Sequence, residues 1–114
     1  MITESSIREI LALYEKHGWI LRRVLFSDDM NTSLADIRES LFGRVAIFPS
    51  TLDALWFSRA SSPENEAWEI RHLSETPFAL VEVVDRDLTD GERNDALRAA
   101  EIKMSEIVKS KRSV

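Results

Sequence analysis

Three successive segments that alternate apolar and polar residues occupy the middle of the chain, and they constrain the fold more than any other feature. The segments are residues 52–60, 67–73 and 78–85. A period of two places successive side chains on opposite faces of a strand. Turn-forming residues separate the segments at 61–65 and 74–77, the second being a four-residue hairpin loop. The pattern therefore predicts three strands in an antiparallel meander.

Segments of helical periodicity stand at both ends of the chain. Residues 3–17 carry apolar side chains at helical spacing and precede Gly18, which can end a helix in the left-handed region. Near the other end, Thr89 and Glu92 form a capping box. We expect a first helix over 3–17 and a last helix from this box to about Lys109.

The connection between the first helix and the meander is less regular. Residues 19–26 favour a strand, and the polar residues 27–31 favour a turn. Ser33 begins a second capping-box pattern that predicts a short helix ending before Gly43. The apolar run 45–48 indicates a strand fragment. The sequence does not decide whether residues 32–52 belong to the sheet layer or lie outside it.

The order helix, strand, short helix, three strands, helix is typical of the α+β class. A chain of 114 residues has room for one hydrophobic core. We therefore expect a single domain over 1–114, with an antiparallel four-stranded sheet and the N-terminal and C-terminal helices on one face.

Alternation divides the strand residues into two sets. One set is almost entirely apolar and is expected to form the core: Trp56, Trp68, Ile70, His72, Ala79, Val81 and Val83. The other set mixes charged and large apolar residues, which is typical of interaction surfaces. The interaction face expected from it contains Leu55, Phe57, Arg59, Arg71, Leu80 and Glu82. Alternatively, its charged residues form cross-strand pairs on a solvated face.

A second polar group on the same set of positions suggests chemistry. Asp53 and Glu69-Ile70-Arg71 resemble the PD-(D/E)xK nuclease pattern, in which carboxylates of neighbouring strands hold a metal ion. The resemblance implies a magnesium site at Asp53 and Glu69, with Arg71 in place of the lysine. The sequence departs from the pattern because no proline precedes Asp53 and no strand is expected after the last helix.

Composition removes several function classes. The net charge of −5 disfavours nucleic acid as a partner, since binding to phosphates draws on positive charge. The chain has no cysteine, and its two histidines are too few for a three-histidine zinc site. We expect no metal and no cofactor. The apolar runs are too short to span a membrane, and we expect a cytoplasmic protein.

These patterns favour a non-enzymatic protein-interaction domain that forms a homodimer, or binds another protein, through the mixed sheet face. The alternative is a metal-dependent enzyme or small-ligand-binding protein that uses Asp53, Glu69 and Arg71 on that same face.

Overall fold

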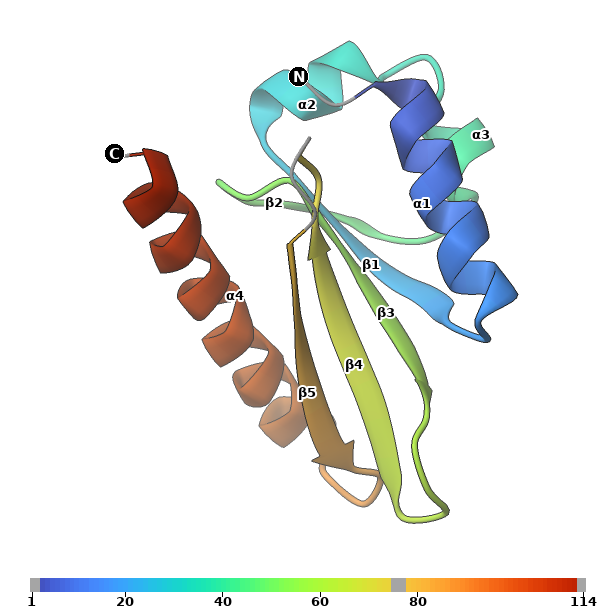
Figure 1. Ribbon diagram of the computed structural model, residues 1–114, viewed down its shortest axis with the longest axis vertical. Coiled ribbons are helices and arrows are strands. Elements are labelled where there is room, and N and C mark those ends of the chain that lie inside the picture. Colours follow the sequence, from blue (N-terminus) through green and yellow to red (C-terminus); the bar gives the residue numbers. More distant parts are fainter. Residues whose placement is uncertain (1–2, 75–77, 113–114) are drawn as a thin grey trace.

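The structure, a computed structural model, describes residues 3–74 and 78–112 and confirms the α+β class (Figure 1). Its elements follow the predicted order, with one additional strand and one additional helix. They are α1 (Glu4–Lys16), β1 (Ile20–Phe26), α2 (Asp28–Ser33), α3 (Arg38–Phe42), β2 (Ile47–Pro49), β3 (Ala54–Ala60), β4 (Asn65–His72), β5 (Ala79–Asp85) and α4 (Asp90–Arg112). Most of the predicted hairpin loop 74–77 lies outside the described residues.

The two long helices begin where the sequence predicts, α4 at the predicted capping box and α1 after Thr3. The Thr3 hydroxyl accepts a hydrogen bond from the Ser6 amide at 3.2 Å, and the Thr89 hydroxyl accepts one from the Glu92 amide at 3.1 Å. These bonds satisfy amides that have no partner inside the first turn of a helix. After α1, Gly18 takes φ 84°, a region that favours glycine.

The predicted turn 27–31 and the predicted helix start at Ser33 are wrong. Ser27 caps α2 instead, since its hydroxyl accepts a hydrogen bond from the Met30 amide at 3.2 Å. Asp28 and Asp29 in the first turn favour this start, because carboxylates stabilise the positive end of the helix dipole. Ser33 is the last residue of α2, and a separate short helix, α3, follows.

The sheet has five strands in the order β2-β1-β3-β4-β5, instead of the predicted four. The predicted meander is confirmed, because β3 pairs antiparallel with β4 and β4 with β5. The fifth strand, β2, comes from the apolar run 45–48, which the sequence did not place inside or outside the sheet. There, Ile47 pairs with Val24 as part of a parallel ladder between β2 and β1.

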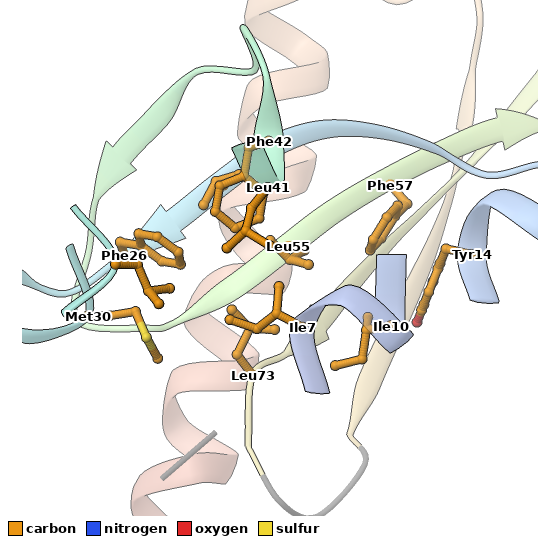
Figure 2. Close-up of a cluster of buried hydrophobic side chains, with 12 residues drawn as sticks. Ile7, Ile10, Tyr14, Phe26, Met30, Leu41, Phe42, Leu55, Phe57 and Leu73 are labelled. Carbon is orange, nitrogen blue, oxygen red and sulfur yellow. The ribbon is translucent and has the colours of Figure 1, made fainter. Parts of the chain in front are cut away.

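The sheet is covered on both sides, so the prediction that both terminal helices lie on one face is corrected. On one side, α1, α2 and α3 pack on β1 and β3 in a first core (Figure 2). Its buried residues are Ile7, Ile10, Tyr14, Val24, Phe26, Met30, Leu34, Leu41, Phe42, Leu55, Phe57 and Leu73. On the other side, α4 packs in a second core, whose buried residues are Leu25, Leu52, Ala54, Trp56, Trp68, Ile70, Val84, Leu97, Ala100 and Met104. Figure 1 shows α1 and α4 on opposite sides of the sheet.

The register of β5 also differs from the predicted division into two faces. Ile70 pairs with Leu80, so Leu80 points to the α4 side together with Ile70. Val81 and Val83 consequently point to the α1 side and are exposed rather than buried. Alternation within a strand can be read from sequence, but a shift of one residue between neighbouring strands exchanges the faces.

Candidate functional site

The α1 side of the sheet is covered over β1 and β3 but open over β4 and β5. Val81 and Val83 lie in the middle of β5, the edge strand, with 54% and 58% of their surface exposed. On β4, Glu69 pairs with Val81 and shares a hollow with Leu13 of α1, which is 54% exposed. We call the surface formed by Leu13, Glu69, Arg71, Val81 and Val83 the uncovered half-face. Val81 and Val83 are neighbours on one face of the edge strand, and covering them would remove exposed apolar surface from water.

A contact between Tyr14 and Glu69 marks the border between the first core and the uncovered half-face. Tyr14 is buried, with its ring stacked on Phe57 at a centroid distance of 4.0 Å (Figure 2). Its hydroxyl donates a hydrogen bond to the Glu69 carboxylate. Burial raises the pKa of Tyr14, the hydrogen bond and charge of Glu69 raise this pKa further, and Arg71 opposes them. Tyr14 therefore stays a neutral donor that fixes Glu69 on the sheet.

A shallow hollow of about 320 Å³ opens beside this border, at the C-terminal end of α1. Arg59 closes one side of it. The Arg59 guanidinium donates to the His17 carbonyl at 2.9 Å and lies 4.5 Å from the centroid of the Trp19 ring. Such a cation over an aromatic face is attracted to the ring electrons. The hollow thus extends the uncovered half-face with an aromatic and cationic rim.

The structure divides the interaction face expected from sequence between the two sides of the sheet. Leu55 and Phe57 are buried under α1, with 0% and 1% of their surface exposed. Arg59 and Arg71 lie on that same side, exposed and half-buried respectively. Leu80 and Glu82 point to the α4 side, opposite Ile70 and Trp68. The six residues therefore do not form one surface.

The polar cluster expected from sequence is not brought together either. Asp53 accepts hydrogen bonds from the Ser27 amide at 2.8 Å and the Ser27 hydroxyl at 3.2 Å, and so joins β3 to the start of α2. Glu69 pairs with Phe57, four residues along the chain from Asp53, which corresponds to about 13 Å of extended strand. Arg71 donates to the His72 carbonyl. Within 3–74 and 78–112, no group of three or more His, Asp and Glu side chains could hold a metal ion.

Sequence reasoning missed the exposed valines because it placed Val81 and Val83 in the core. The available signal was that β5 is apolar on both faces: Leu80 and Val84 accompany one core, which leaves the two other valines for the opposite face. A strand that is apolar on both faces needs covering on both. In this structure α4 covers one face of β5, and the face with Val81 and Val83 stays exposed.

Comparison with protein-family models, curated proteins and solved structures finds no match to this chain. Across the part of the chain that the structure describes, no helix combines the length and apolar character that crossing a membrane requires.

Proposed function

We propose that this protein is a non-enzymatic protein-interaction domain that forms a homodimer through the uncovered half-face. One observation carries the proposal: Val81 and Val83 expose 54% and 58% of their surface in the middle of a regular edge strand. Edge strands in stable monomers are commonly protected by charged residues, bulges or covering elements. Cytoplasmic localisation stays part of the proposal and is supported by a composition without cysteine.

The charges of the uncovered half-face favour a second copy of the same chain as the partner. A twofold dimer presents the same surface from each subunit, so each charge must meet its complement on an identical face. Glu69 and Arg71 are two residues apart on β4 and point to the same side. Antiparallel packing of two such faces can bring each Arg71 close to the other subunit's Glu69, around a centre formed by Val81 and Val83.

The expected strength of this association follows from the apolar area it removes from water. Each exposed valine contributes on the order of 1 kcal/mol when the remaining half of its surface is buried. Twofold symmetry doubles that contribution, and Leu13 adds to it. Because association also costs several kcal/mol of lost freedom, we expect a weak dimer with a dissociation constant in the micromolar range.

Sedimentation velocity over a range of micromolar concentrations tests the proposal. The wild type should sediment increasingly as a dimer, and Val83→Lys or Val81→Lys should shift the equilibrium to the monomer. Ile102→Lys is a matched control, because Ile102 is 52% exposed on α4, on the other side of the sheet. Unchanged circular dichroism and melting temperature would show that a variant is folded. A wild type that stays monomeric at every concentration would refute the homodimer.

A further inference from the structure

A second hollow, on the α4 side of the sheet, gathers positive charge in an acidic chain. Its volume is about 310 Å³, and its lining residues are Arg22, Arg23, Trp68, Asp90, Arg93 and Asn94. The pairing of β1 with β3 is irregular between Leu21 and Arg23. A β-bulge of this kind can redirect a side chain, and here Arg22 and Arg23 both lie over the Trp68 ring, at 5.5 Å and 5.9 Å from its centroid.

Two hydrogen-bond donors of residues that line this hollow are buried and have no acceptor among the residues that the structure describes. They are the Trp68 indole Nε1 and the Arg93 Nε, the only such side-chain atoms in the described part of the chain. Trp68 exposes only 3% of its surface. The comparable indole of Trp56 donates to Glu101 at 2.9 Å. Buried donors in folded proteins are normally satisfied, and each exception calls for a partner.

The charges around the hollow favour an anion as that partner. Three arginines line it, while its one acidic residue, Asp90, has a side chain that is 96% exposed and contacts Arg93 at 3.1 Å. Glu66 is further from Arg93, at 4.0 Å. Arg23 is also fixed by a hydrogen bond to the Asn94 side chain at 2.5 Å. Among the residues that line the hollow, positive charge exceeds negative charge, and Glu66 and Glu82 lie beside it, Glu82 opposite Trp68 on the same side of the sheet.

We propose that this hollow binds the phosphate or carboxylate group of a small ligand. Both groups offer oxygen acceptors for the Trp68 and Arg93 donors, and both carry the charge that Arg22 and Arg23 complement. This site lies on the opposite side of the sheet from the uncovered half-face, and it stands independently of the proposed dimer.

Nuclear magnetic resonance of the tryptophan indole N–H groups tests the proposal directly. The chain has three tryptophans, so each indole gives one resolvable signal. Phosphate and acetate are titrated separately to concentrations on the order of 10 mM, with sodium chloride at equal ionic strength as the reference. We expect the Trp68 signal to move downfield while the Trp19 and Trp56 signals stay in place. A response to phosphate alone or to acetate alone identifies the group, and a Trp68 signal that responds to neither would overturn the proposal.

Variants separate a built site from general attraction of anions. Trp68→Phe keeps an aromatic ring and removes the donor, and Arg22→Gln removes one charge at the rim. Each should weaken binding of the effective anion by roughly tenfold in titration calorimetry. Arg44→Gln is the matched control, because Arg44 is an exposed arginine in the loop before β2. If Trp68→Phe does not fold, Arg22→Gln decides the question. Equal affinity of Arg22→Gln and Arg44→Gln would contradict the site.

Discussion

At the scale of single residues, Tyr14 connects the first core to the surface. Its ring belongs to the buried cluster, while its hydroxyl reaches Glu69 at the border of the uncovered half-face. The sequence predicted a helix over 3–17 with apolar side chains at helical spacing, and Tyr14 lies within that range. It did not indicate the partner of the hydroxyl, because that contact joins residues 55 positions apart in the chain. Long-range pairing of this kind follows from how the elements pack, which periodicity does not encode.

The raised pKa of Tyr14 predicts a specific response to alkali. Tyr14 is the only tyrosine, so the ultraviolet absorbance of tyrosinate reports on it alone. In the unfolded chain the phenol should ionise near pH 10. In the folded protein it should ionise at higher pH, because burial and Glu69 both disfavour the anion. The folded state then holds a proton that the unfolded state releases, so this contribution to stability is constant below about pH 10 and declines as pH rises further.

Glu69→Gln supplies the control for this titration. The variant keeps a side-chain oxygen that can accept the Tyr14 hydrogen bond but removes the negative charge, and the ionisation of Tyr14 should therefore move back toward its ordinary value. A folded wild type whose phenol titrates like the unfolded chain would show that Tyr14 is neither buried nor bonded to Glu69 in solution, and an equal titration of wild type and Glu69→Gln would show that Glu69 does not act on Tyr14.

At the scale of elements, the glycine that ends α1 and the cap that begins α4 could be predicted from the sequence, and the packing of the strands could be predicted only in part. Thr89 and Glu92 identified the start of α4, and the Thr89 hydroxyl also donates a hydrogen bond to the Glu92 carboxylate at 3.0 Å. By contrast, Ser33 showed a similar pattern yet ends α2, because the acidic turn after Ser27 competes for the start of the helix. For the strands, alternation located β3, β4 and β5 but could not determine which face of β5 accompanies which face of β4.

The cap of α4 can be tested by substitution. Thr89→Ala removes the acceptor for the Glu92 amide and should lower the free energy of unfolding by about 1 kcal/mol in a urea titration. Thr89→Ser keeps a hydroxyl at the same position and should retain most of that stability. If both variants unfold at the wild-type urea concentration, the cap contributes nothing to the stability of α4.

At the scale of the whole molecule, the sheet separates two cores and leaves one surface uncovered. The first core joins α1, α2 and α3 to β1 and β3, and the second joins α4 to the sheet from the opposite side. The sequence predicted the α+β class and the order of the elements. It did not predict helices on both sides of the sheet. Because β3 is apolar on both faces, a core on one face alone was enough to account for part of the pattern. Because α4 packs on the opposite side of the sheet from α1, no described helix covers Val81 and Val83.

Hydrogen exchange of the backbone amides, followed at protein concentrations below and above the midpoint of association, tests the central claim that the uncovered half-face is where two copies meet. We predict that peptides from β4 and β5 become more protected as the concentration rises, while peptides from β2 and α4 around Phe48 and Ile102 keep the same exchange rate. Protection that rises instead around Phe48 and Ile102, or exchange that does not depend on concentration anywhere, would contradict the account.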